Sequence, residues 1–96
     1  MTLVKVCGIR EARHALVAID AGADMLGLVF YPPSPRDVSM EEAQAVRDAV
    51  RAADPDGRVK LVGLFVNESP ARMIHVAAEA GLDVIQLSGD ESPSVR

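Results

Sequence analysis

The sequence lacks the features that mark several large classes of protein. A single cysteine in 96 residues excludes an internal disulfide framework and a zinc site built from several cysteines. Ten basic against 14 acidic residues give a net charge of −4, which argues against binding to nucleic acid or to an anionic membrane surface. No apolar run approaches the roughly 18 residues of a membrane-spanning helix, and residues 1–10 lack the layout of a signal peptide. We therefore expect a cytoplasmic protein.

Aromatic residues are also scarce, at 3% of the chain, whereas hydrophobic residues make up 49%. A core of small aliphatic side chains suits buried parallel strands that are covered by alanine-rich helices. The length is that of one small domain, so we expect residues 1–96 to form a single domain.

Four short, almost continuously apolar runs predict β-strands at residues 3–7, 25–30, 60–66 and 84–88. Between them, three segments have helical periodicity. The first is expected to end at Gly22, the second to begin with a capping box of Ser39 and Glu42, and the third to begin at Ser69. The residues expected to face the sheet are Ala12, Ala15, Leu16 and Ile19 in the first helix, Ala43, Val46, Val50 and Ala53 in the second, and Met73, Ile74 and Ala77 in the third.

The resulting order, β-α-β-α-β-α-β, predicts an α/β fold with parallel strands and right-handed crossovers. Two architectures fit this order: a small doubly wound sheet, or half of a (βα)₈ barrel. A whole barrel usually needs about 200 residues or more, which is over twice this length.

Cys7 is the first candidate for chemistry, because functional groups in parallel α/β folds gather at the carboxyl ends of the strands. A thiol there lies near the positive end of the next helix and can act as a nucleophile or a general base. The alternative is a small, buried apolar residue. Lys5 shares the strand face of Cys7, where its charge either favours a thiolate or is neutralised by a carboxylate, and we expect the latter.

Arg36 lies in a loop with three prolines after the second strand, where a guanidinium can grip a carboxylate or a phosphate. Alternatively, it is a surface arginine paired with Asp37. Gln86 and Ser88 share one face of the fourth strand and are candidates for substrate binding, or for hydrogen bonds between strands. The sequence has no glycine-rich phosphate loop and no cluster of metal ligands, so we expect neither a cofactor nor a metal ion.

Several motifs together resemble the phosphoribosylanthranilate isomerases, a family of (βα)₈-barrel enzymes in tryptophan biosynthesis. The motifs are KVCGI at residues 5–9, GAD at 22–24, GLVF at 27–30, SPR at 34–36, VGLFVN at 62–67 and VIQL at 84–87. The resemblance covers nearly the whole chain and implies the N-terminal half of such a barrel.

The resemblance also implies an Amadori rearrangement of N-(5'-phosphoribosyl)anthranilate, with Cys7 as the general base and Arg36 as the group that binds the anthranilate carboxylate. Ser88 stands where the family has histidine in the motif Q-L-H-G. The family's general acid, an aspartate on the fifth strand, and its phosphate-binding loops after the seventh and eighth strands are not among these 96 residues. The isolated chain is therefore expected to be a poor enzyme.

Two other functions are compatible with the sequence. One is a non-catalytic half-barrel fragment that associates with itself, because its first and fourth strands would be open edges. The other is an α/β module that binds phosphorylated sugars without the anthranilate group and without a role for Arg36.

Overall fold

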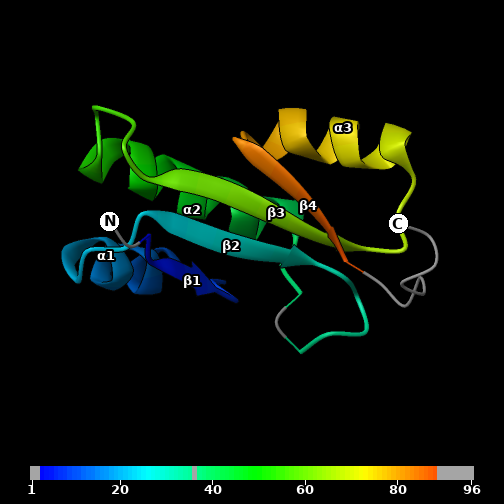
Figure 1. Cartoon of the computed structure of the whole chain (residues 1–96), viewed down its shortest axis with the longest axis horizontal. Helices are drawn as coiled ribbons and strands as arrows, with labels where there is room; N and C mark the ends of the chain where they lie inside the picture. Colours follow the sequence, from blue (N-terminus) through cyan, green and yellow to red (C-terminus); the bar gives the residue numbers. More distant parts are fainter. Residues whose placement is uncertain (1–2, 36, 89–96) are drawn as a thin grey trace.

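The computed structural model describes residues 3–35 and 37–88, which form four strands and three helices in alternation (Figure 1). The elements are β1 (Lys5–Cys7), α1 (Ala12–Asp20), β2 (Met25–Phe30), α2 (Met40–Ala53), β3 (Lys60–Val66), α3 (Pro70–Ala80) and β4 (Val84–Ser88). The predicted bounds of the second, third and fourth strands are confirmed.

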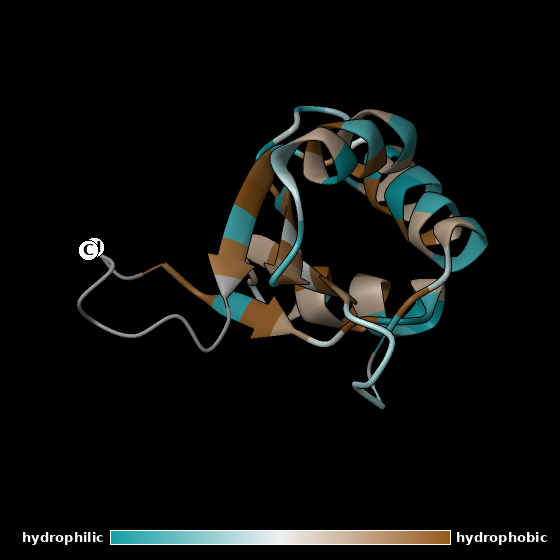
Figure 2. Cartoon of the chain, turned by 90° about the vertical axis from the view of Figure 1, so that its right-hand side faces the viewer, coloured by the Kyte–Doolittle hydropathy of each residue, from teal (hydrophilic) through white to brown (hydrophobic). Residues whose placement is uncertain are grey.

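The four strands form one parallel sheet in the order β1-β2-β3-β4, and all three helices lie on the same side of it (Figure 2). A doubly wound sheet reverses its strand order and carries helices on both faces. Sequential order with helices on one side is instead the arrangement of a (βα)₈ barrel. The prediction of half a barrel is therefore confirmed, and the doubly wound alternative is wrong.

The first strand is shorter than predicted, because it begins at Lys5 rather than at residue 3. The amide nitrogen of Val4 donates to Oδ2 of Asp24 at 2.8 Å, so this amide bonds a side chain instead of a neighbouring strand. The same kind of bond recurs in the second half of the chain, where the Leu61 amide donates to Oδ2 of Asp83 at 2.9 Å. Each of these aspartates follows a positive-φ glycine, Gly22 or Gly81, in a turn between a helix and a strand.

The core lies between the sheet and the helices. Leu26 and Leu28 of β2 and Leu61 and Phe65 of β3 are buried there, beneath the alanine-rich faces of the helices. The capping box of Ser39 and Glu42 is present at the start of α2. Of the four residues expected to face the sheet in α2, three are buried, namely Ala43, Val46 and Val50, whereas Ala53 is exposed.

The predicted faces of the two outer helices are partly wrong. Leu16 of α1 is 42% exposed and Ile74 of α3 is 65% exposed, although both were expected to face the sheet. The residues buried in these helices are Ala15, Ala18, Val76 and Ala80. In the described part of the chain, α1 and α3 each pack against α2 on one side only, so an apolar side chain on the other side has nothing to cover it.

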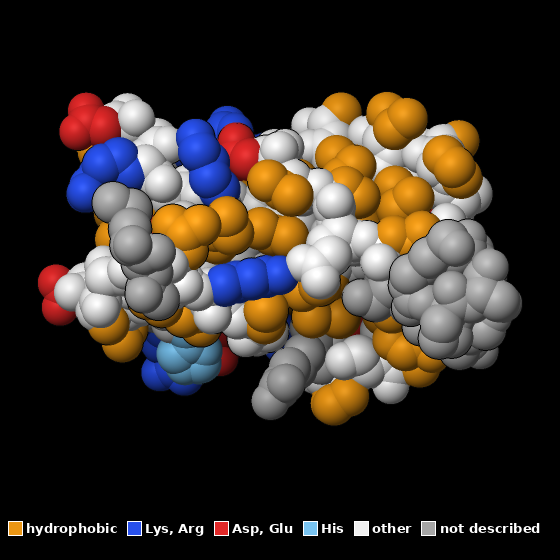
Figure 3. Space-filling model, viewed as in Figure 1, with side chains coloured by type: hydrophobic (Ala, Val, Ile, Leu, Met, Phe, Trp, Pro, Cys, Tyr) orange, Lys and Arg blue, Asp and Glu red, His pale blue; other side chains and the backbone are white. Residues whose placement is uncertain are grey.

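Apolar side chains are therefore exposed along both edges of the half-barrel. Leu3, Val4, Leu16 and Val17 form the first edge, and Ile74, Ile85 and Leu87 form the second edge. Figure 3 shows apolar side chains on the helix-free side of the sheet and over the region of α3 and β4.

Among the residues that the structure describes, no helix is long and apolar enough to cross a membrane.

Candidate active site

Cys7 ends β1 and is exposed, so the alternative of a buried apolar cysteine is wrong. The chain turns directly after it, because Gly8 has a φ of 83°, a backbone conformation that glycine adopts without steric cost. The amide nitrogens of Gly8 and Ile9 both donate to the carbonyl oxygen of Gly27, at 3.0 and 3.1 Å. These bonds fix the turn after Cys7 to the neighbouring strand β2.

Gly27 also provides the space that the thiol occupies. Cys7 and Gly27 are partners in the register of β1 and β2. A Cβ atom at position 27 would lie 3.1 Å from the sulfur of Cys7 and 3.3 Å from its Cα. The missing side chain therefore lets the thiol lie against the sheet, on the face that the helices leave open.

Lys5 and Gln86 meet on this same helix-free face. The Lys5 ammonium donates to Oε1 of Gln86 at 2.5 Å, although β1 and β4 are separated by two strands. A bond of this kind needs a strongly curved sheet, as a half-barrel has. Among the described residues, the partner of Lys5 is therefore an amide rather than the expected carboxylate. Of the two roles predicted for Gln86, the structure contains the hydrogen bond between strands, which joins β4 to β1.

Two of the predicted site residues cannot be located in the same way. Arg36 lies outside the described residues, although its neighbours are described. Ser88 ends β4 beside Val66, and its side chain lies outside the described part of the structure. The structure thus brings Cys7, Lys5 and Gln86 to one face and leaves the roles of Arg36 and Ser88 as predictions.

The loop around position 36 is held by backbone hydrogen bonds on both sides. The Ser34 amide donates to the carbonyl of Tyr31 at 2.8 Å, and the Asp37 amide donates to the carbonyl of Ser34 at 3.1 Å. The Val38 amide then donates to the carbonyl of Val29 in β2 at 2.9 Å. The described residues of the loop at residues 31–38 are therefore bonded to one another and to β2.

Arg10 contacts this loop, which the sequence analysis did not predict. One guanidinium nitrogen donates to the carbonyl oxygen of Pro35 at 3.2 Å, and the other lies 3.5 Å from Oε2 of Glu42. The second carboxylate oxygen of Glu42 accepts from the Ser39 amide at 2.8 Å. In the sequence, the only indication of a role for Arg10 is its position three residues after Cys7, and this position does not identify its contact partners.

The bonds around Glu42 lower the pKa of its carboxyl group below the usual value of 4.5. The largest cause is the hydrogen bond from the Ser39 amide, and the positive charge of Arg10 acts in the same direction. Both contacts favour the ionised carboxylate, so they connect folding of this region to pH.

We expect Glu42→Gln to lower the free energy of unfolding at pH 7, and this difference from the parent chain to vanish in acid. A lowered pKa in the folded state stabilises the protein above the pKa of the unfolded state, and the stabilisation is lost as pH falls through the folded value. Urea unfolding of both chains between pH 7 and pH ~3 checks this. Glutamine can still form a capping box, so the comparison isolates the charge. A difference that is equally large at both pH values would contradict the expectation.

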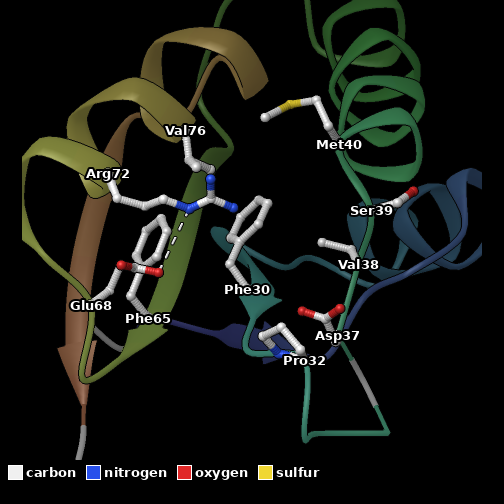
Figure 4. Close-up of a pocket in the computed structure, with 10 residues that line it drawn as sticks. All are labelled: Phe30, Pro32, Asp37, Val38, Ser39, Met40, Phe65, Glu68, Arg72 and Val76. Atoms are coloured by element: carbon white, nitrogen blue, oxygen red, sulfur yellow. Dashed lines mark ion pairs between the residues drawn. The ribbon is translucent and has the colours of Figure 1, made fainter.

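A cavity of about 220 Å³ lies at the carboxyl ends of β2 and β3, on the helix side of the sheet (Figure 4). The rings of Phe30 and Phe65 stack within it at a centroid distance of 5.2 Å. Arg72 of α3 lies across the cavity from α2 and pairs with Glu68 at 3.7 Å. Neither Cys7 nor Gln86 lines this cavity, so it is separate from the helix-free face.

The residues that could bind a metal ion are dispersed. His14 and His75 are exposed on α1 and α3. Within residues 3–35 and 37–88, no group of three or more histidine, cysteine, aspartate or glutamate side chains could hold a metal ion.

Comparison with known proteins gives a consistent result. Residues 4–96 match the family model described as N-(5'phosphoribosyl)anthranilate (PRA) isomerase. The N-(5'-phosphoribosyl)anthranilate isomerase of Roseiflexus castenholzii is 52% identical over 91 residues, which are 93% of this chain and 42% of the relative. The chain therefore spans less than half the length of the curated relatives that it matches.

Solved structures show the same partial match. The crystal structure of phosphoribosyl anthranilate isomerase from Thermotoga maritima has a TM-score of 0.82 and 38% identity, and the match covers 99% of this chain and 44% of that one. Another crystal structure of the enzyme, in complex with reduced 1-(o-carboxyphenylamino)-1-deoxyribulose 5-phosphate, also has a TM-score of 0.82, and the match covers 46% of that chain.

Proposed function

The chain belongs to the N-(5'-phosphoribosyl)anthranilate isomerase family, and on this basis we propose that it forms the N-terminal part of such an enzyme. The proposed substrate is N-(5'-phosphoribosyl)anthranilate, and the product is 1-(2-carboxyphenylamino)-1-deoxyribulose 5-phosphate. Residues 1–96 then make up one partial barrel domain. The proposed reaction uses a phosphorylated biosynthetic intermediate, which supports a cytoplasmic location.

In the proposed mechanism, a general acid first protonates the ribose ring oxygen and the C1–O bond breaks. The lone pair of the anthranilate nitrogen then forms the C1=N bond of a Schiff base. Cys7, as the general base, removes the proton from C2. The electrons of the C2–H bond form C1=C2, and the C1=N π electrons return to nitrogen. Transfer of a proton to C1, with loss of the enol proton, gives the ketone at C2.

The observation that carries this proposal is the exposed thiol of Cys7, fixed at the carboxyl end of β1 on the helix-free face. A general base must reach the proton that it abstracts, and the inner face of a barrel at this end is where substrates of such folds bind. The proposed general acid and phosphate loops belong to the part of the family that these 96 residues do not cover.

The proposal is tested in a chimaera, in which residues 4–96 replace the matching portion of the Roseiflexus castenholzii isomerase. This relative is 52% identical over the matched residues, so most contacts between the two portions should be retained. The chimaera should convert phosphoribosylanthranilate, whereas the isolated 96-residue chain should not. A folded chimaera without turnover would contradict the proposed function.

We also propose that the isolated chain associates with itself through its two apolar edges. Ile85 and Leu87 are 39% and 49% exposed, on the face of β4 opposite to the helix-free face. An uncovered apolar surface next to an open strand edge favours association.

Sedimentation velocity over a range of concentrations should show dimers or larger species of the isolated chain. The double variant Ile85→Lys and Leu87→Lys should shift the distribution towards monomer, because it places charge on the second edge. Ala52→Lys, which adds a charge to an exposed position of α2, is the matched control and should leave the distribution unchanged. A parent chain that is monomeric at every concentration would contradict the proposal.

A further inference from the structure

We propose that Arg10 is a positioning residue, which sets the place of the loop at residues 31–38 relative to the end of β1. This inference rests on the proposed function, in which Arg36 on that loop binds the substrate carboxylate and Cys7 at the end of β1 removes the proton. Arg10 is the side chain that joins these two parts of the site.

The first step is that Arg10 starts from a fixed point. The backbone between Cys7 and Arg10 is bonded twice to the carbonyl oxygen of Gly27, through the amides of Gly8 and Ile9. The side chain of Ile9 is only 5% exposed and belongs to the core cluster. The Cα atom of Arg10 therefore cannot shift without breaking contacts to β2 and to the core.

The second step is that the two guanidinium nitrogens contact two different elements. One donates to the carbonyl of Pro35, the residue directly before position 36, and the other faces the carboxylate of Glu42 at the start of α2. Because a guanidinium is planar and presents its donors in a fixed fork, its two contacts define an orientation as well as a distance. A lysine ammonium is a single point of charge and cannot reproduce both contacts with the same geometry.

The third step is that Glu42 is itself held in place. Its carboxylate accepts the Ser39 amide through the oxygen that does not face Arg10, and its own amide donates to the Ser39 hydroxyl at 3.0 Å. Arg10 thus connects the loop to the rigid N-terminus of α2 on one side and to β1 on the other. The backbone bonds within the loop come from residues of β2 and the loop itself, whereas Arg10 adds a contact from the segment between β1 and α1.

This arrangement has a consequence for kinetics that a purely structural contact would not have. A displaced loop weakens the proposed carboxylate contact equally in the bound substrate and in the transition state, because the carboxylate takes no part in bond breaking. Loss of such uniform binding raises KM and leaves kcat unchanged. For a half-exposed, charge-assisted contact we expect a rise in KM of about threefold to tenfold.

The test uses the chimaera with Arg10→Met, which removes the guanidinium but keeps an unbranched side chain. KM should rise by about threefold to tenfold, with kcat within about twofold of the parent. Arg10→Lys should give an intermediate KM. Arg13→Met is the matched control, because Arg13 is an exposed arginine one turn further along whose ion pair is with Glu11, and it should leave both constants unchanged.

A double-mutant cycle with Arg36→Ala then tests whether Arg10 acts through the loop. In the Arg36→Ala background, Arg10→Met should change KM by less than about twofold, since the contact that it positions is already lost. An effect of the same size in both backgrounds, or a fall in kcat without a change in KM, would overturn the inference.

Hydrogen exchange in the 96-residue chain gives a measurement that does not depend on activity. Arg10→Met should speed exchange at the amides of Ser34 and Asp37, while the amides of α1 keep the parent rates. Unchanged exchange in the loop would overturn the positioning role. If the parent chimaera were inactive while exchange changed as expected, the proposed function would fail and the contact of Arg10 with the loop would stand.

Discussion

Cys7→Ala in the chimaera should lower kcat by about 10²- to 10⁴-fold, the range that one general base contributes. The expectation follows from the place of the thiol, which is exposed on the helix-free face and fixed by the turn at Gly8. Because alanine cannot accept a proton, the proposed base is lost, and the C2 proton would have to leave to water. KM should change far less than kcat, since the thiol contributes little to binding.

Steady-state turnover of phosphoribosylanthranilate measures this effect, with circular dichroism to verify that the fold is retained. Cys7→Ser should be nearly as slow as Cys7→Ala, because an unassisted hydroxyl keeps its proton near neutral pH. Ala52→Ser is the matched control, since it changes an exposed position of α2, away from the apolar edges and the strand ends, and should keep the parental rate. A Cys7→Ala chimaera that kept about a tenth or more of the parental kcat would remove Cys7 from the role of base.

The strands could be predicted accurately because their signal is local. The three strands with correct bounds are short, almost continuously apolar runs, and the sheet buries the face that packs on the helices. The residues directly after them are Tyr31, Asn67 and Gly89. The predicted beginning of the first strand was wrong, because Leu3 and Val4 are apolar residues typical of a strand but lie before it. The carboxylate of Asp24 bonds the Val4 amide there, and nothing in the local sequence specifies that contact.

The orientation of the outer helices depended on tertiary contacts that periodicity cannot supply. Ile74 and Val76 are both apolar and only two positions apart, so the sequence of α3 allows either to face the sheet. The structure buries Val76 and exposes Ile74, because α3 packs against α2 on one side only. In α2, with a helix on each side, the predicted face was mostly correct.

In the candidate site, the place of Cys7 could be predicted from the sequence, but the contacts between side chains could not. The rule that function gathers at strand carboxyl ends led to Cys7, and that residue is exposed there. The partner of Lys5 is 81 residues away on a strand that is not adjacent, so only the curvature of the sheet brings it to Gln86. Arg10 contacts Pro35 and Glu42 for the same reason, since two strands and a helix must first assemble.

Phe65→Ala should lower the free energy of unfolding of the 96-residue chain by about 3–5 kcal/mol, the usual cost of truncating a buried phenylalanine. Phe65 is 1% exposed and is among the largest fully buried side chains. Its ring also stacks on Phe30 with an interplanar angle of 12°, and such a pair contributes about 0.5–1.5 kcal/mol beyond burial. Because Phe65 already lines the cavity between α2 and α3, its removal enlarges a space that neighbouring side chains do not fill.

Urea unfolding at low protein concentration, followed by circular dichroism, measures this loss. A typical small domain is stable by only about 5–15 kcal/mol, so the variant should be largely unfolded in mild urea where the parent remains folded. Phe65→Leu is the matched control: it keeps an apolar side chain on the same face and should cost about 1–2 kcal/mol. Equal unfolding midpoints for Phe65→Ala and the parent would mean that the packing of β3 against the two helices does not hold the half-barrel together. The stability of the isolated chain would then have to come from association at its apolar edges, and it would rise steeply with protein concentration.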